Sequence, residues 1–271
     1  AAAPRRLDWT ATPELRKAVA GADAAFKATV GRTDLAVLRT DEFTNGAARA
    51  LRRHHPRSPT RSARPLLSCA GFLKQNKLSP DGMMQLAFQL AHHKMHGGLL
   101  PSTYESASTA AFKHGRTETI RSATPEAAAF TAAFADPAST PAAREAAMRA
   151  AAENHGRITR EALMGKGFDR HLFALHDLAK SEGRTPRLFE CDAMARLRTI
   201  ILSTSTLASE ALQGGGFGPV NERCYAIGYG IRDNECGAQI MSYDRDSAQF
   251  VDCLRAAMAE MRGSLQLDAK R

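Results

Sequence analysis

The run TYESASTAAFKHGRTETIR, residues 103–121, constrains this chain more than any other segment. It places several hydroxyl side chains around a basic stretch, and those hydroxyls include Tyr104, Ser106 and Thr117. Hydroxyl groups and fixed cations are poor components of an apolar core, but together they suit a small carboxylate. Taken alone, the same hydroxyls are also typical of helix caps and turns.

The composition describes an ordinary globular protein with excess positive charge. With 271 residues, the chain is long enough for one large domain or two small ones. A net charge of +9 suits anionic lipid, a phosphorylated cofactor or nucleic acid. Because only 6% of residues are aromatic and no aromatic-interleaved basic motif occurs, we expect no nucleic acid and keep a membrane surface as a candidate partner.

The cysteine pattern argues against metal and disulfide chemistry. The five cysteines are odd in number and widely spaced, and no C-x-x-C pair occurs. This spacing predicts neither a zinc site nor a disulfide framework, and it is typical of a reducing compartment. We expect no metal ion.

Three segments are expected along the chain. Residues 1–44 hold a helix, opened by Thr12 and Pro13, and a short strand at 34–39. Residues 45–68 are rich in Arg and Pro, which predicts either a solvated basic loop or an insertion that attaches to anionic lipid or an acidic partner. Residues 69–271 are expected to form the main domain.

The main domain is expected to be α+β, helix-rich first and with a mixed sheet later. Helix starts are predicted after Ser79 and Thr124, each followed by proline, and further helices at 141–163, 169–181 and 246–264. Short apolar runs bounded by Gly and Asn predict strands at 199–203, 224–231 and 238–243.

The run 103–121 closely resembles the carnitine-binding segment of the carnitine acyltransferases, above all their palmitoyltransferase-like members. Other motifs of the family occur in order on both sides of it. The resemblance implies the C-terminal part of a chloramphenicol-acetyltransferase-like fold, in which a histidine base lies between a coenzyme A tunnel and a carnitine tunnel. It also implies acyl transfer between coenzyme A and carnitine in fatty acid metabolism, on the matrix side of the mitochondrial inner membrane. Both compounds are substrates, and no cofactor is expected.

The resemblance assigns the carnitine site residue by residue. Tyr104, Ser106 and Thr117 are expected to hydrogen-bond the carnitine carboxylate. Arg170, in the GFDRH motif, is expected to attract that carboxylate over a longer distance, although the motif alone indicates a helix start with a surface arginine. Phe217 is expected near the trimethylammonium group, since a ring face suits a quaternary cation. Arg121 is expected to be structural.

The same comparison assigns the oxyanion site and the acyl channel. In the run STST, Ser205 is expected to stabilise the oxyanion, with Ser203 beside it. Gly215 lies in a glycine-rich stretch where short-chain members carry a bulky side chain, so an open channel for a medium or long acyl chain is expected. Without the resemblance, both stretches are typical of flexible loops.

The segment FLKQNKLSPD resembles the coenzyme A phosphate site of the family. Lys74 and Lys77 are expected to bind phosphate groups, with Ser79 and Asp81 shaping the turn before a helix. A second phosphate lysine of the family corresponds to Ala70, which predicts weakened affinity for coenzyme A. Taken alone, two lysines before a helix cap are typical of a solvated face.

The family's general base is missing from this sequence. That histidine sits in an H-x-x-x-D motif upstream of the other motifs, and none of the nine histidines here is followed by Asp at that spacing. Three hypotheses follow. The chain is the C-terminal part of an acyltransferase completed by another segment or a second chain, a non-catalytic subunit of a larger assembly, or a binder of acyl-coenzyme A or carnitine without turnover.

Overall fold

The computed structural model describes residues 9–40, 43, 69–98, 100–206, 212, 214–232 and 236–266. The chain divides into two compact units, Ala1–Thr33 and Asp34–Arg271. The predicted basic insertion at 45–68 lies outside the described residues.

The first unit contains helix α1, Pro13–Arg32. It begins as predicted, with Pro13 in the first turn and the Thr12 side chain accepting a hydrogen bond from the backbone N–H of Leu15. None of the residues of α1 is buried.

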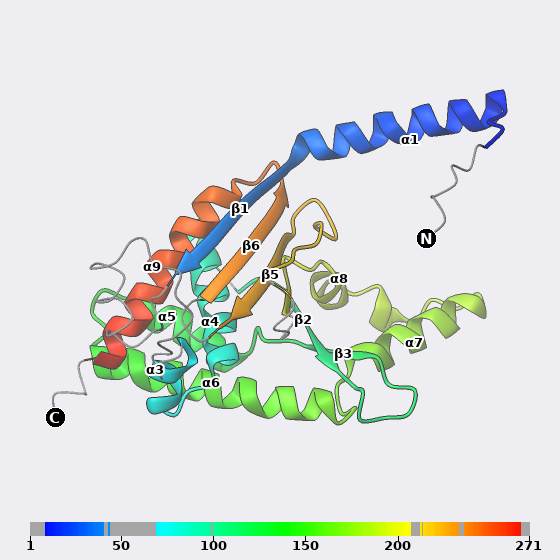
Figure 1. Ribbon diagram of the computed structural model, residues 1–271. Helices are drawn as coiled ribbons and strands as arrows, with labels where there is room; N and C mark the ends of the chain where they lie inside the picture. The colour runs from blue at the N-terminus through cyan, green and yellow to red at the C-terminus, as the bar shows by residue number, and fades with distance from the viewer. Residues whose placement is uncertain are drawn as a thin grey trace, which may run out of the picture. The chain divides into compact units, whose positions relative to one another are not determined.

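The second unit is built on a six-stranded mixed sheet (Figure 1). Its strands lie in the order β1-β6-β5-β4-β2-β3. They comprise β1 Thr33–Thr40, β2 Thr103–Ser108, β3 Thr117–Ile120, β4 Leu202–Thr206, β5 Tyr225–Ile231 and β6 Cys236–Tyr243. Strand β4 runs parallel to both neighbours, β2 and β5, whereas β2–β3 and β5–β6 are antiparallel pairs.

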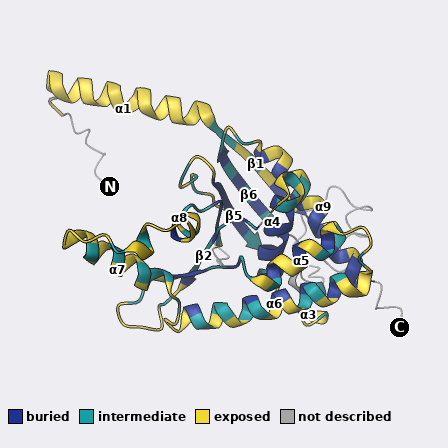
Figure 2. Ribbon diagram, turned by 180° about the vertical axis from the view of Figure 1, so that it is seen from behind, coloured by how far each residue is buried: buried dark blue, intermediate teal, exposed yellow. Residues whose placement is uncertain are grey.

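Helices close one face of the sheet and supply most of the core (Figure 2). They include α4 Pro80–His96, α5 Pro125–Ala135, α6 Pro141–Leu163 and α9 Ser247–Gln266. Helix α4 packs against α5, α6 and α9 and is buried from Gly82 to His92. A buried helix needs mostly apolar residues, and the buried stretch of α4 is apolar except for Gln85, Gln89 and His92.

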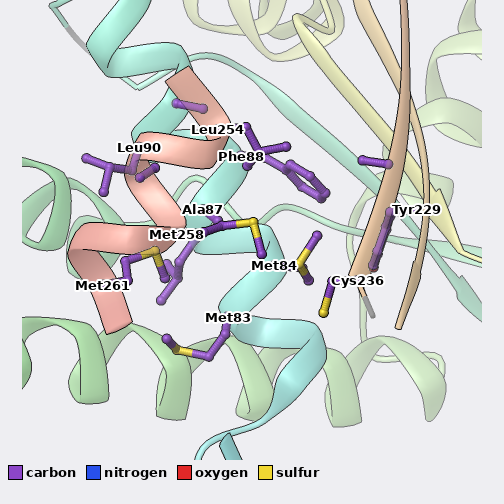
Figure 3. Close-up of a cluster of buried hydrophobic side chains, with 14 of the residues drawn as sticks. Met83, Met84, Ala87, Phe88, Leu90, Tyr229, Cys236, Leu254, Met258 and Met261 are labelled. Atoms are coloured by element: carbon purple, nitrogen blue, oxygen red, sulfur yellow. The ribbon is translucent and has the colours of Figure 1, made fainter. Parts of the chain in front are cut away.

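The centre of this core is rich in methionine (Figure 3). Met83 and Met84 of α4 lie with Met258 and Met261 of α9, and Tyr229 of β5 joins them from the sheet. Methionine side chains fill irregular space between elements that cross at different angles.

Shorter elements surround this frame. They are α3 Cys69–Gln75, α7 Asp169–Ser181, the 3-10 helix η1 Arg187–Phe189 and α8 Asp192–Arg198. None of the helices in the described part of the chain combines the length and apolarity that crossing a membrane requires.

The predicted helices and three of the predicted strands are confirmed, with two corrections. Strand β4 begins at Leu202 rather than at 199, because Ile201 precedes the ladder and the polar residues up to Thr206 continue it. The run 103–121, which by itself is typical of caps and turns, forms the antiparallel pair β2–β3. The first part of the chain is helix-rich, as expected, but it also contains β2 and β3, which were not expected; β4, β5 and β6 follow later.

Candidate active site

One face of the sheet carries a set of hydroxyl groups on three adjacent strands. We call it the hydroxyl face, and define it by Tyr104, Ser106, Thr117, Ser203 and Ser205. Tyr104 is the register partner of Ser203, while Ser106 and Ser108 pair with Thr119 and Thr117. Since register partners share a face and side chains alternate along a strand, these five hydroxyls lie on the same side of the sheet.

The other face of the same strands points into the helices. Glu105 is the partner of Thr204, and Thr204 is the partner of Ile227. All three are buried, whereas Tyr104 and Ser106 are half-buried. Strand β2 thus separates a polar outer face from a helix-covered inner one.

Arg170 ties the hydroxyl face to helix α7. Its Nη2 donates to the Tyr104 hydroxyl at 2.9 Å and to Thr117 Oγ1 at 3.1 Å. The guanidinium carbon also lies 5.8 Å from the centre of the Tyr104 ring. Because Tyr104 accepts this bond, its own O–H remains available as a donor. Three residues predicted for one carboxylate are thus in direct contact.

Arg121 is structural, as expected. It is ion-paired with Asp169 at the start of α7 and also donates to the carbonyl of Thr103 at 2.8 Å and that of Leu197 at 3.1 Å. Thr119 adds a hydrogen bond of 2.9 Å to the same aspartate. These bonds fix the first turn of α7, and therefore Arg170, against strands β2 and β3.

A glycine-rich segment, residues 214–218, lies across the hydroxyl face beside Ser205. A Cβ placed on Gly228 would come within 2.1 Å of the Gly215 carbonyl oxygen. Gly228 is the register partner of Ser205, so the backbone of Gly215 lies next to that serine. A Cβ on Gly215 itself would meet nothing within 4 Å. Phe217 is half-buried in this segment.

The two serines of β4 differ in access. Ser203 is 4% exposed, whereas Ser205 is half-buried and able to meet a ligand. Between them, Thr204 turns inward, accepts from Gln85 Nε2 at 3.0 Å and donates to the Tyr104 carbonyl at 3.0 Å. The sequence analysis did not single out Thr204 or Gln85. The strict alternation of STST in a strand would have indicated the inward position of Thr204 alone.

A buried polar cluster lies on the inner face behind Tyr104. His155 Nε2 is 2.9 Å from Glu105 Oε2, and the Tyr229 hydroxyl donates to Asp81 Oδ1 at 2.6 Å. Burial raises the pKa of Glu105 to about 7. Burial lowers the pKa of His155, but the hydrogen bond and charge of Glu105 outweigh it, so the net shift is upward.

Ligand atoms of Asp81, Glu105 and His155 lie within 4.8 Å of one another. Two carboxylates and an imidazole form a donor set that could hold a divalent cation. The Glu105–His155 hydrogen bond and the Tyr229–Asp81 hydrogen bond already satisfy much of this set from within the chain. Asp81, predicted at the turn before α4, therefore also belongs to this cluster.

The other residues predicted for coenzyme A lie around the start of α4. Lys74 and Lys77 are exposed, and Lys77 adopts the left-handed conformation with φ of 57°. Ser79 caps the helix by accepting from the Gly82 N–H at 3.2 Å. Two exposed ammonium groups beside a helix N-terminus form a surface that suits an anionic phosphate.

No histidine in the described part of the chain hydrogen-bonds to a hydroxyl-face residue. The bonded imidazoles contact Tyr225, Glu105 and Arg198 instead. Within the described residues, the hydroxyl face thus presents hydroxyl groups and a guanidinium, and no imidazole is hydrogen-bonded to it.

Clustered hydroxyls, an arginine and an accessible serine thus lie together on a mixed sheet. A family profile described as Choline/Carnitine o-acyltransferase matches residues 68–256, which is more than half of the chain. The chain belongs to this choline/carnitine acyltransferase family.

Individual relatives agree with this membership. The chain is 37% identical over 268 residues to carnitine O-palmitoyltransferase 2, mitochondrial, of Xenopus tropicalis, covering 97% of the chain and 37% of that protein. It is 44% identical over 199 residues to the Homo sapiens protein of the same name, covering 72% and 30%. Choline O-acetyltransferase of Sus scrofa is 30% identical over 272 residues, covering 98% and 38%. The chain thus spans about a third of the length of these relatives.

Proposed function

We propose that this chain supplies the carnitine-binding and oxyanion-stabilising part of a carnitine O-acyltransferase. The enzyme moves a medium- or long-chain acyl group between coenzyme A and carnitine. One observation carries the proposal: Tyr104 and Thr117 are bonded to Arg170 on the same face of the sheet as Ser205.

The carboxylate of carnitine fits the first part of this site. The Arg170 guanidinium supplies fixed positive charge, while the Tyr104 hydroxyl, with Ser106 and Thr117 beside it, supplies donors. Hydrogen bonds to an anion are about twice as strong as neutral ones, so few are needed. The ring of Phe217 suits the trimethylammonium end of the same molecule.

The acyl-transfer step concerns Ser205. When the carnitine hydroxyl attacks the thioester carbonyl, negative charge develops on the carbonyl oxygen. The Ser205 hydroxyl is accessible and can donate to that oxygen, a contribution worth roughly a hundredfold in rate or more. The open space at Gly215 leaves room for a long acyl chain beside it.

We assign coenzyme A to the exposed surface around the start of α4. Lys74 and Lys77 would bind its phosphate groups, with Ser79 holding the turn and Asp81 reaching the inner cluster. Because Ala70 replaces a lysine of the family, we expect the affinity to be lower than that of relatives.

A base must remove the proton of the carnitine hydroxyl, and the family motifs found in this sequence do not include that base. A positioned base is worth about two to four powers of ten. We therefore infer that the isolated chain is nearly inactive and that another segment or a second chain supplies the histidine. We further propose that the activity is mitochondrial, on the matrix side of the inner membrane; the mitochondrial names of two relatives support the first part of this proposal.

The test measures binding and turnover separately. We expect the purified chain to bind carnitine in calorimetry, with weaker binding by Tyr104→Phe, and to release almost no coenzyme A from palmitoyl-coenzyme A. Adding the N-terminal portion of a palmitoyltransferase relative should restore carnitine-dependent release, and Ser205→Ala should then abolish it. Enzyme-like turnover by the chain alone would overturn the missing-base inference.

The alternative is a non-catalytic, acyltransferase-derived subunit of a larger assembly. The replacement of a family phosphate lysine by Ala70 favours it. This alternative predicts that the chain does not bind carnitine and that the added N-terminal portion restores no turnover. The same experiment therefore separates the two functions.

A further inference from the structure

A cavity of about 810 Å³ lies at the end of the sheet where the parallel strands β2, β4 and β5 begin. Thr103 and Ile201 line it at the strand ends, and α8 forms another part of its wall. Its polar lining consists mainly of His92, His96, Arg121, Arg196, Arg223 and Arg245. None of the hydroxyl-face residues lines this cavity.

The lining is strongly positive. It contains no aspartate or glutamate. Arg121 is neutralised by Asp169, but no ion pair within the described residues involves Arg196, Arg223 or Arg245. Three guanidinium charges therefore face this cavity without a carboxylate partner from the described chain.

Two buried polar atoms in this lining have no hydrogen-bond partner in the described structure. They are Nδ1 of His92 and Nε of Arg245. His92 is only 8% exposed, so water does not readily reach it. A buried donor without a partner costs about 1–3 kcal/mol, and such atoms commonly mark a place that a ligand or ion satisfies.

The surroundings keep these groups fixed in place. The buried Tyr225 hydroxyl donates to the Arg245 carbonyl at 2.9 Å and lies 3.1 Å from His96 Nε2. The Arg245 guanidinium carbon also stacks 5.0 Å from the Tyr225 ring centre. A guanidinium held in one orientation loses little freedom when it binds an anion.

The imidazole at the cavity wall is neutral. Burial, together with the charges of the nearby His96 and Arg245, lowers the pKa of His92 to about 3. A neutral imidazole can still present an N–H at Nδ1. The charge that attracts an anion therefore comes from the arginines, and His92 adds a donor.

We propose that this cavity is a binding site for a small phosphorylated molecule, whose phosphate is held by Arg223, Arg245 and His92. Three uncompensated cations match the multiple charge of a phosphate better than the single charge of a carboxylate, and guanidinium groups bind phosphate in bidentate fashion. A cavity of 810 Å³ also admits a small organic body beyond the phosphate.

This site is distinct from the one proposed for coenzyme A. Lys74 and Lys77 precede helix α4, whereas His92 and His96 lie in its last turns. At about 1.5 Å per residue, Asp81 and His92 are roughly 16 Å apart along the helix axis. Failure at one site therefore leaves the other testable.

Calorimetry at constant ionic strength tests the proposal with inorganic phosphate and glycerol 3-phosphate as probes. We expect saturable binding of one equivalent, weakened roughly tenfold or more by Arg223→Gln and by Arg245→Gln. The matched control is Arg255→Gln, an exposed arginine of α9 outside the cavity, which should bind like the unmodified chain. Tighter binding of glycerol 3-phosphate would identify a phosphomonoester, and tighter binding of inorganic phosphate would identify the free ion.

Three outcomes would overturn the proposal. They are no saturable binding of either probe, equal losses in Arg223→Gln and the control, and a Lys74→Gln, Lys77→Gln double variant that loses phosphate binding. An acidic peptide that binds in place of both probes, and more tightly, would instead indicate a protein-docking surface. Because Arg223 is exposed, its variant should fold normally, which circular dichroism would verify.

Discussion

Arg170 Nη2 lies 2.9 Å from the Tyr104 hydroxyl, and this bond joins helix α7 to strand β2 across 66 positions of the chain. It brings together two side chains that were assigned to the same carboxylate from separate motifs. The arginine also donates to Thr117, so two hydroxyl groups hold its guanidinium in place.

Replacing Arg170 with Gln should weaken carnitine binding by about tenfold or more, because a charge-assisted contact worth roughly 1.5–3 kcal/mol is lost. Stability should change little, since the side chain is only half-buried. Calorimetric titration with carnitine measures the effect. Arg184→Gln, an exposed arginine after α7, is the control, and equal affinities in the two variants would contradict the assignment.

Thr204→Val should lower the free energy of unfolding by about 1–3 kcal/mol, because Gln85 and the Tyr104 carbonyl each lose a partner in a buried site. Urea titration followed by circular dichroism measures this. The control is Thr206→Val on the same face of the same strand, where the hydroxyl is exposed. A loss as large at Thr206 would show that strand propensity, rather than these bonds, is responsible.

The pair Glu105 and His155 should make stability fall as pH rises. Both pKa values are raised in the folded chain, so the folded state binds more protons than the unfolded one. The stabilisation is complete below the ordinary Glu pKa of 4.5 and is lost as pH rises through about 7.

Urea unfolding at a series of pH values should therefore show a decline of about 1–3 kcal/mol across this window. Glu105→Gln should flatten it, whereas Glu153→Gln, at an exposed position of α6, should leave it unchanged. A stability that increases with pH in both the unmodified chain and Glu153→Gln would rule out this explanation.

Gly228→Ala should displace the segment 214–218, since its Cβ would lie 2.1 Å from the Gly215 carbonyl oxygen. Overpacking of this kind costs typically about 1–3 kcal/mol. Gly230→Ala is the matched control on the same strand and face, because its Cβ would meet nothing within 4 Å. Thermal unfolding compares the two variants, and indistinguishable melting temperatures would mean that the glycine segment moves aside freely.

Local chemistry made the helices predictable from sequence. Thr12, Ser79 and Thr124 each cap a helix with a proline in its first turn, and each side-chain bond spans only three residues. Signals of this range are visible in a short window of sequence.

Strands β2 and β3 were not predictable in the same way. Their inward positions include Glu105 and Thr103, so the apolar alternation that marks a half-buried strand is absent. Burial of Glu105 depends on His155, which lies 50 positions away. The burial of such a polar strand becomes visible only in the three-dimensional structure, where its partner residues are in place.

The residues of the candidate site could be named from the sequence, but the contacts that hold them in place could not. The hydroxyls, Arg170 and Ser205 follow from the family motifs in the chain. The contact between Gln85 and Thr204 spans 119 positions, and the cavity arginines come from separate loops and helices. No local pattern connects such residues, because the sheet order that brings them together is set by the whole core.

Strand β2 alternates between two different environments, with Tyr104 and Ser106 facing outward and Glu105 facing His155. Inserting or deleting one residue within it would turn Glu105 out and Tyr104 in, and both polar networks would fail at once. A substitution on β2 therefore changes one face of the sheet, whereas a one-residue insertion or deletion within the strand changes both faces.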